Sequence, residues 1–203
     1  MRNKKLVLGF AALMVVALTT GCAKPPQQEI DAAKAAVSAA EAAQAAKYAS
    51  EAWDKAQQAM NAVNAEVEAQ NQKFALFRSY TKAKELVAAA TQAANEAKDA
   101  AIAGKEKAKN EAQAAIDAAK AVVAEAQTAL ADLGKCKRQP KDFKKDLEAM
   151  KGNLDGLAAQ VTGIESAFAG EDFFGAKAQA ESLKAQVDTL KTDMAGAKTK
   201  IKC

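Results

Sequence analysis

The sequence lacks histidine and has few of the residues that interrupt helices or build strands. No histidine occurs in 203 residues, so the most common general base and metal ligand is missing. Three prolines, ten glycines and 5% aromatic residues are too few for a strand-rich fold, which needs aromatic and β-branched residues and frequent turns. Alanine, the best helix former, accounts for 54 residues. We therefore expect an all-α protein that is not an enzyme and that holds no metal or cofactor.

Residues 1–21 have the pattern of a secretory signal peptide. Three cations precede an apolar stretch at 6–18, and small residues then lead into Cys22. The apolar stretch is shorter than the roughly 20 residues that span a bilayer. The pattern resembles a bacterial lipobox, in which the cysteine is acylated after cleavage just before it, although Thr19 stands where leucine is usual. The alternative is an ordinary signal peptide that precedes an incidental cysteine.

A lipobox places the mature protein, from Cys22 onward, in the bacterial cell envelope. Among bacterial lipoproteins, a residue other than aspartate after the lipidated cysteine directs the protein to the outer membrane, and Ala23 fits that rule. Residues 22–28 would then be a lipidated tether. Cleavage removes three of the 29 basic side chains and leaves 26 against 25 acidic ones, so bulk charge does not favour nucleic-acid binding.

The alanine-rich region 29–133 is predicted to form three helices, at about 29–46, 50–72 and 80–133. The first helix has two competing alanine stripes, so its buried face is undecided. Ser50 is a candidate N-cap for the second helix. The third would be a long rod, and it contains a change of spacing around Gly104. We expect an elongated helical bundle or a long coiled coil.

The segment 134–203 is predicted to be an antiparallel helical hairpin, with helices at about 140–168 and 172–202. Glycine, cysteine, basic residues and proline at 134–140 mark the boundary before it. Apolar residues then recur with alternating spacings of three and four on both sides of a turn at 169–172. The first heptad series is Phe143, Leu147, Met150, Leu154, Leu157, Val161, Ile164 and Phe168. The second is Phe173, Ala176, Ala180, Leu183, Val187, Leu190, Met194, Ala197 and Ile201.

The run from Tyr48 to Ala56 resembles the Y-A-P-x-x-L-x-x-A helix-start signature of an alanine-rich bacterial lipoprotein domain of unknown function. Ser50 replaces the proline of that signature and Trp53 its leucine. A second motif begins at Tyr80 and is similar to a tetratricopeptide helix. The resemblance covers about residues 25–100. It implies a helical fold in the cell envelope and no catalytic residues.

Two further groups of residues are interpreted as structural. Paired carboxylates, Glu66 with Glu68 and Glu171 with Asp172, are expected to be solvated helix surface. Five aromatic residues lie in the alanine-rich region: Tyr48, Trp53, Phe74, Phe77 and Tyr80. We expect them to wedge between alanine-lined helices, because alanine buries little area. The alternative is a stacking site for a ligand or glycan.

A basic cluster is the strongest candidate for an interaction surface. Six cations occur within eleven residues, and a closed hairpin brings three more from the C-terminus to the same end. The nine residues are Lys135, Lys137, Arg138, Lys141, Lys144, Lys145, Lys198, Lys200 and Lys202. They would meet an anionic surface. The equally weighted alternative is a solvated end whose cations partly offset the helix dipoles.

A disulfide is predicted between Cys136 and Cys203. Pairing Phe168 with Phe173 across the turn sets an antiparallel register that brings Cys203 close to Cys136. The compartment is oxidising, and these thiols remain once Cys22 is acylated. The bond would close a long loop of the chain, and chain-entropy models give such a bond a stabilisation of the folded state of about 4 kcal/mol. Free thiols or an intermolecular bridge are the alternatives.

The combined prediction is an outer-membrane lipoprotein on the periplasmic face, with a structural or scaffold role. Candidate partners are the membrane through the acyl chains on Cys22, peptidoglycan, anionic lipid and another envelope protein. Two other functions stay open. One is a periplasmic binding or chaperone-like module with a groove between helices, and the other is a stress-protective helix former.

Overall fold

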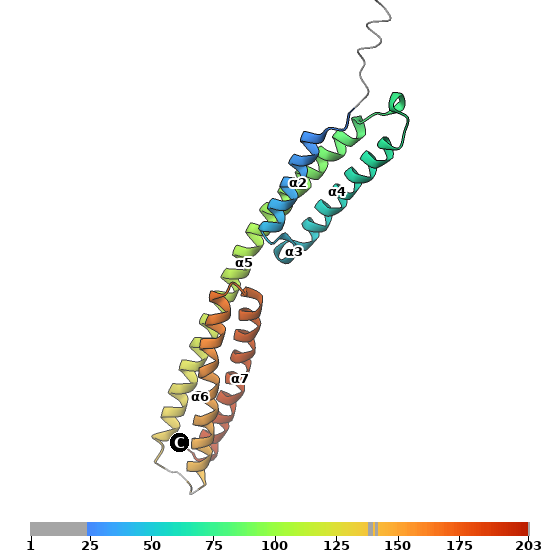
Figure 1. Cartoon of the computed structure of the whole chain (residues 1–203). Coiled ribbons are helices and arrows are strands. Elements are labelled where there is room, and N and C mark those ends of the chain that lie inside the picture. Colours follow the sequence, from blue (N-terminus) through green and yellow to red (C-terminus); the bar gives the residue numbers. More distant parts are fainter. Residues whose placement is uncertain (1–23, 138–139, 141, 203) are drawn as a thin grey trace, which may run out of the picture. The chain divides into compact units, whose positions relative to one another are not determined.

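The computed structural model describes residues 24–137, 140 and 142–202. This part of the chain is α-helical and contains no strand, which confirms the all-α fold class. The α-helices are α2 (Gln27–Ala42), α3 (Ala45–Tyr48), α4 (Ser50–Asn71), α5 (Thr81–Gly134), α6 (Phe143–Ala169) and α7 (Phe173–Lys200), and one 3₁₀ helix, η1, spans Ala75–Phe77. The chain divides into two compact units, unit 1 ending at Gly104 and unit 2 beginning at Lys105 (Figure 1).

The division between the units differs from the predicted boundary at 134–140. It falls inside α5, which contributes residues 81–104 to unit 1 and residues 105–134 to unit 2. The predicted hairpin is therefore not a separate domain. The apolar stripe of residues 105–134 is covered by α6 and α7. An apolar helix face must be buried against another element, and here the hairpin supplies that element.

Unit 1 packs α2, α3 and α4 against the first part of α5. Its core has two clusters that differ in side-chain size. The cluster near the start of α2 contains Ile30, Ala33, Met60, Val63, Val87 and Ala90. The other consists of Ala40, Ala45, Ala56, Ala94, Ala97 and Ala101, with Tyr48 and Trp53 packed against it. The second cluster is lined by methyl groups, so the helices there depend on close backbone approach and on a few large neighbours.

Gly104 is the clearest sign of close backbone approach in unit 1. A Cβ atom at this position would lie 2.3 Å from the carbonyl oxygen of Tyr48. Real Cβ atoms do not come so near to a backbone oxygen, so only glycine permits α5 to pass the end of α3 here. The change of spacing around Gly104 that the sequence shows therefore coincides with a contact that requires this residue.

The helix breaks in unit 1 differ in detail from the prediction. The first helix ends at Ala42 rather than near residue 46, because Gln44 adopts a left-handed conformation with φ of 61°. Ser50 is not the N-cap of α4. Ala49 takes that position, and its carbonyl oxygen accepts a 2.9 Å hydrogen bond from the N–H of Trp53. The predicted break after residue 71 is confirmed, since α4 ends there and α5 begins at Thr81.

Unit 2 is a bundle of α6, α7 and the second part of α5. The predicted apolar face of α7 is buried from Phe173 to Ile201, with Ala197 half-buried. The rings of Phe168 and Phe173 lie 5.2 Å apart across the turn, as the predicted hairpin register requires. Within the turn, Glu171 is left-handed with φ of 61°, and Asp172 caps α7 by accepting a hydrogen bond from the N–H of Gly175.

Three ion pairs between α5 and the segment containing α7 share one register. Lys105 contacts Glu171 at 2.6 Å, Glu111 contacts Lys177 at 2.7 Å, and Glu125 contacts Lys191. All three pairs are separated by 66 residues in the sequence. A constant offset means that α5 and the segment containing α7 run in the same direction with one alignment along their length. Lys120 and Glu165, 2.5 Å apart, add a contact between α5 and the antiparallel α6.

Candidate functional site

The predicted basic cluster lies at one end of unit 2. The C-terminal ends of α5 and α7 meet there with the start of α6 (Figure 1). Seven of its nine residues are described, and all seven are exposed: Lys135, Lys137, Lys144, Lys145, Lys198, Lys200 and Lys202. Arg138 and Lys141 lie outside the described residues. The fold therefore brings the C-terminal lysines to the same end as the cations around residue 140.

The contacts at this end leave most of the cluster facing solvent. Lys135 forms an exposed ion pair with Asp132 at 3.2 Å. Lys198 and Lys200 occupy the last turn of α7, where positive charge offsets the partial negative charge of the helix end. A cavity of about 480 Å³ lies between α5 and α7, with Leu133, Met194 and Lys198 among its lining residues. Two lysines, Lys191 and Lys198, and two carboxylates, Glu125 and Asp132, also line this cavity, so its charges balance.

Cys136 lies beside the basic cluster. Cys136 is 7% exposed, and its Sγ atom is 3.5 Å from the carbonyl oxygen of Asp132. Ile201, two positions before the C-terminal cysteine, is also 7% exposed. Cys203 and Cys22 lie outside the described residues. The pairing of Cys136 with Cys203 and the acylation of Cys22 therefore stay predictions.

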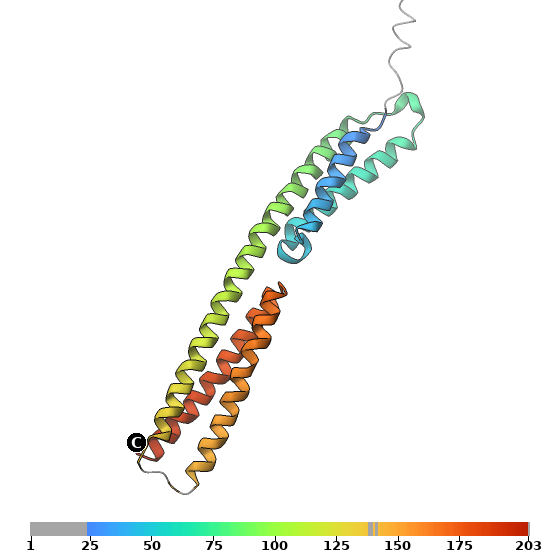
Figure 2. The same ribbon diagram turned by 60° about the vertical axis from the view of Figure 1, so that its left-hand side comes forward.

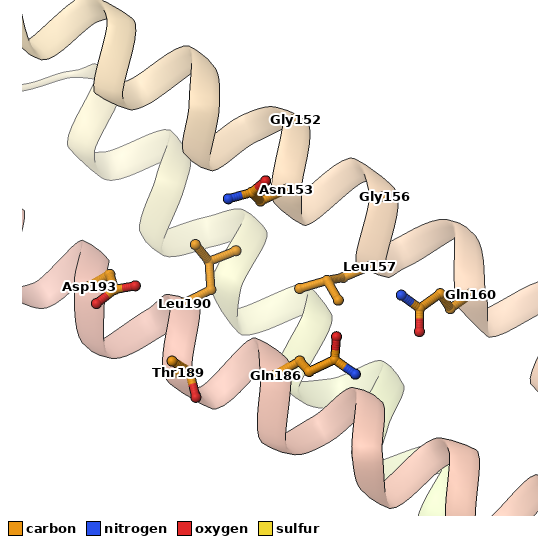
Figure 3. A pocket seen from close by; sticks show the side chains of 9 residues that line it. All are labelled: Gly152, Asn153, Gly156, Leu157, Gln160, Gln186, Thr189, Leu190 and Asp193. Carbon is orange, nitrogen blue, oxygen red and sulfur yellow. The ribbon is translucent and has the colours of Figure 1, made fainter.

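A groove of about 600 Å³ runs between α6 and α7. Gly152 and Gly156 leave gaps between the other α6 side chains that line the groove, and a Cβ atom at either glycine would meet nothing within 4 Å. Figure 3 shows Leu157 and Leu190 on facing helices, with polar side chains such as Gln186 at the rim. This groove was not predicted as a site, although two glycines four residues apart in a helix are a signal that the sequence contains.

The aromatic residues of unit 1 do not share one role. Tyr80 is buried, and Tyr48 and Trp53 are half-buried against the alanine cluster, as the wedge interpretation predicts. Phe74 and Phe77 are 69% and 75% exposed, so for them the interpretation is wrong. They lie in η1 and the residue before it, outside the helix packing that the other three support.

The paired carboxylates are engaged in local electrostatic contacts. Gln70 donates a 2.7 Å hydrogen bond to Glu66, and with Lys82 it holds the pKa of Glu66 below its ordinary value. Glu171 pairs with Lys105, and Asp172 caps α7. The contacts of Glu66 favour its charged, unprotonated form.

The ion pairs between helices of unit 2 also shift pKa values. Hydrogen bonding and charge attraction with Lys177 lower the pKa of Glu111, and the same contact raises the pKa of Lys177. Hydrogen bonds from Glu165 and Glu125 raise the pKa values of Lys120 and Lys191. Each shift favours the charged form of the side chain. All of these groups lie at the surface, where solvent screens such interactions.

Residues 24–137, 140 and 142–202 contain neither a cluster of metal ligands nor a helix suited to cross a membrane. This part of the chain holds no group of three or more histidine, cysteine, aspartate or glutamate side chains arranged for a metal ion. None of its helices combines the length and the apolar character that crossing a membrane requires.

The chain was also compared with known proteins. No protein-family model, no curated protein and no solved structure matches it. The resemblance of residues 25–100 to the alanine-rich lipoprotein domain therefore stays a prediction from the motifs alone. The features that bear on function are the basic end of unit 2, the groove between α6 and α7, and the sequence around Cys22.

Proposed function

We propose that the protein is a lipoprotein of the bacterial outer membrane, held on the periplasmic face by acyl chains on Cys22. The observation that carries the proposal is the lipobox-like sequence ending at Cys22, two positions before the described chain begins at Lys24. The helical units then serve as a scaffold or interaction module of the cell envelope. The resemblance of the motifs at Tyr48 and Tyr80 to the lipoprotein domain supports the same location.

The basic end of unit 2 is the surface through which the scaffold meets its partner. Seven exposed lysines converge there, and the only acidic residues among positions 132–146 are Asp132, Asp142 and Asp146. Positive charge concentrated on one end attracts anionic surfaces, which include lipid headgroups, peptidoglycan carboxylates and acidic envelope proteins. Replacing Lys144, Lys145, Lys198 and Lys200 by glutamine should weaken capture of crosslinked envelope partners while the helix content stays unchanged.

A disulfide between Cys136 and Cys203 would fix this basic end. It would join the end of α5 to the end of α7 and so hold the two lysine groups together. Thiol titration of the denatured, unreduced protein should find no free thiol, and a non-reducing gel should show a monomer. Two titratable thiols, or a reducible dimer that Cys203→Ser abolishes, would contradict the pairing.

Acylation is tested by the chemical state of Cys22 and by the variant Cys22→Ser. The mature protein should fractionate with membranes, and its N-terminal peptide should carry acyl chains. Cys22→Ser should accumulate as uncleaved precursor or as a soluble periplasmic form. A matched control is Cys136→Ser, which keeps the lipobox intact. If Cys22→Ser is processed and membrane-bound like the parent protein, the lipoprotein assignment is wrong.

A second candidate function is a binding or chaperone-like module. The groove between α6 and α7 favours it, because Gly152 and Gly156 leave room for an occupant between the helices. This function is tested by the double variant Gly152→Leu with Gly156→Leu, whose leucine side chains would fill the groove. Loss of a crosslinked partner in that variant, with the lysine variant unaffected, would favour this function over the scaffold with a basic docking end. A third reading, a stress-protective helix former, predicts low helicity in dilute solution, so a cooperative melt monitored by circular dichroism would exclude it.

A further inference from the structure

The segment between α4 and α5 exposes a compact group of large apolar side chains. Of the five exposed large hydrophobic residues in the described chain, three lie within four positions. Phe74, Leu76 and Phe77 are 69%, 76% and 75% exposed, and the two phenylalanine rings lie 6.3 Å apart. We call these three residues the apolar tip. Isolated exposed hydrophobic residues are common, but a cluster of this kind usually marks a contact surface.

Polar contacts hold the segment that carries the apolar tip. The guanidinium of Arg78 donates a 2.8 Å hydrogen bond to the carbonyl oxygen of Asn71 at the end of α4. The hydroxyl of Tyr80 donates to the Asn71 side chain at 2.5 Å, and the N–H of Ser79 donates to the side chain of Gln70 at 3.1 Å. Tyr80 and Gln70 are themselves buried, at 4% and 7% exposure. The backbone is thus anchored on both sides, and the apolar side chains are directed outward.

The charged residues nearest to the apolar tip in the sequence are all positive. The sequence contains no acidic residue between Glu68 and Glu85. Four cations occur in that interval: Lys73, Arg78, Lys82 and Lys84. One of them, Lys82, also contacts Glu66 at 3.2 Å. Aromatic and apolar side chains flanked by lysine and arginine match the bilayer interface, where rings enter the acyl boundary and cations meet phosphate.

The apolar tip lies at the end of unit 1 that also holds the start of α2. Figures 1 and 2 both show the start of α2 beside η1 and the start of α5. The core supports this arrangement, since Ile30 in the first turns of α2 packs in one cluster with Val87 in the first turns of α5. Cys22 is two residues before Lys24, so a fully extended chain places it no more than about 7 Å away.

We propose that the apolar tip inserts into the interface of the lipid bilayer that carries the acylated N-terminus. The inference rests on the proposed acylation of Cys22 for the position of the bilayer, and it adds a second contact that the anchor does not supply. Acyl chains hold the protein at the membrane, while the apolar tip and its cations fix how unit 1 meets the lipid surface. The occupant is lipid rather than a second protein, because the chain entry already brings this end to the bilayer.

The first experiment measures insertion in the acylated protein. A single reporter is made by Phe77→Trp in a Trp53→Phe background, and the protein is reconstituted into vesicles of phosphatidylethanolamine and phosphatidylglycerol. The reporter emission should shift to shorter wavelength, and brominated lipids should quench it. The control reporter is Ile102→Trp, because Ile102 is 58% exposed and lies 21 positions after the start of α5, roughly 30 Å along the helix. Its emission should stay that of a solvated indole.

The second experiment removes the acyl anchor, so that failure of the two proposals can be told apart. The chain without residues 1–21 and with Cys22→Ser should still float with the same vesicles. The triple variant Phe74→Ser, Leu76→Ser and Phe77→Ser should reduce its partition coefficient by at least about tenfold. Ile102→Ser should leave it unchanged. Circular dichroism should give equal helix content for all variants.

The outcomes separate lipid from other occupants. A solvated, unquenched reporter at position 77 in the acylated protein, or unchanged flotation of the triple variant, would overturn the proposal. A shift that appears without lipid and grows with protein concentration would assign the apolar tip to a second copy of the chain and overturn it as well. If Cys22 proves unacylated while the unacylated chain floats through its apolar tip, the insertion stands and the lipoprotein proposal fails.

Discussion

Unit 1 and unit 2 are both helical bundles, but they are held together by different kinds of packing. One of the two core clusters of unit 1 is built from alanines, and α5 approaches Tyr48 so closely that Gly104 has no room for a Cβ atom. Unit 2 buries large side chains along α7, including Leu183 and Met194, and aligns α5 with α7 through ion pairs at a constant offset. Helices lined by methyl groups depend on backbone fit, whereas heptad helices depend on side-chain volume.

The largest expected effect is the loss of a large side chain from unit 2. Leu183 is fully buried, and Leu183→Ala should lower the free energy of unfolding of unit 2 by about 2–5 kcal/mol. Trp53, the single tryptophan, lies in unit 1 and reports on that unit alone. Urea unfolding followed by circular dichroism should therefore show an early transition, while the fluorescence midpoint of Trp53 stays unchanged. An equal shift in both signals would mean that the two units unfold together.

The next effect tests backbone fit in unit 1. Gly104→Ala adds a Cβ atom 2.3 Å from the carbonyl oxygen of Tyr48, so α5 and α3 must separate. The strain should exceed the gain in helix propensity and give a net loss of about 1–2 kcal/mol. The midpoint of Trp53 fluorescence in urea should fall accordingly. A stability gain would show that the close approach of the two backbones does not exist in solution.

A glycine-to-alanine substitution in unit 2 should instead raise the free energy of unfolding. Gly156 lies in α6, and a Cβ atom there would meet nothing within 4 Å. Gly156→Ala should therefore stabilise unit 2 by about 0.5–1 kcal/mol through helix propensity alone. Thermal unfolding monitored by circular dichroism measures it, with Gly163→Ala as a control at a second open glycine. Destabilisation at Gly156 but not at Gly163 would indicate that the packing of α6 against α7 beside the groove requires glycine at position 156.

The smallest effect concerns the ion pairs between α5 and α7. The pKa of Glu111 is lowered from its ordinary value of 4.5 by Lys177, so the pair stabilises the folded state above that value and loses this effect as the pH falls. Because the raised pKa of Lys177 lies above 10.5, its contribution is lost only as the pH rises beyond that value. Glu111→Gln should reduce the loss in the free energy of unfolding as the pH falls, the acid limb of the stability curve. Added salt should make the parent protein and the variant more alike. An unchanged acid limb would show that screening removes the contribution of the pair.

Much of the fold could be predicted because heptad periodicity and composition act locally. The burial of α7 follows the predicted series, and the contact between Phe168 and Phe173 follows from the short turn between two matched heptads. The predicted third helix, about 80–133, corresponds to α5, whose buried residues run from Ala83 to Leu133. In α7 the apolar face has a single period, so only one side of the helix can be buried.

The face of α2 could not be predicted, because both of its stripes contain alanine. The structure buries Ile30, Ala33 and Ala40, and leaves Ala32 and Ala39 exposed. Ile30 has enough area to reach Met60 and Val63, so a single large residue selects the face. The turn at Gln44 escaped prediction for a related reason, since a left-handed glutamine carries no signal that glycine or asparagine would give.

Part of the candidate site was predictable in the same way. A hairpin of known register must return Lys198 and Lys200 to the cations that precede α6. The exposure of Phe74 and Phe77 could not be predicted, because an aromatic residue is expected to be buried. The hydrogen bonds of Arg78, Ser79 and Tyr80 that hold this segment join residues on either side of it.

The sequence by itself determined that the protein is helical, where most helices run, and that its last two helices form a hairpin, because propensity and periodicity depend on residues close in the chain. Only the tertiary structure decided that α5 is shared between two units, that the hairpin covers its second part, and that Gly104 fits against Tyr48. Those features depend on which surfaces meet after the helices form, and that choice rests on contacts between residues far apart in sequence.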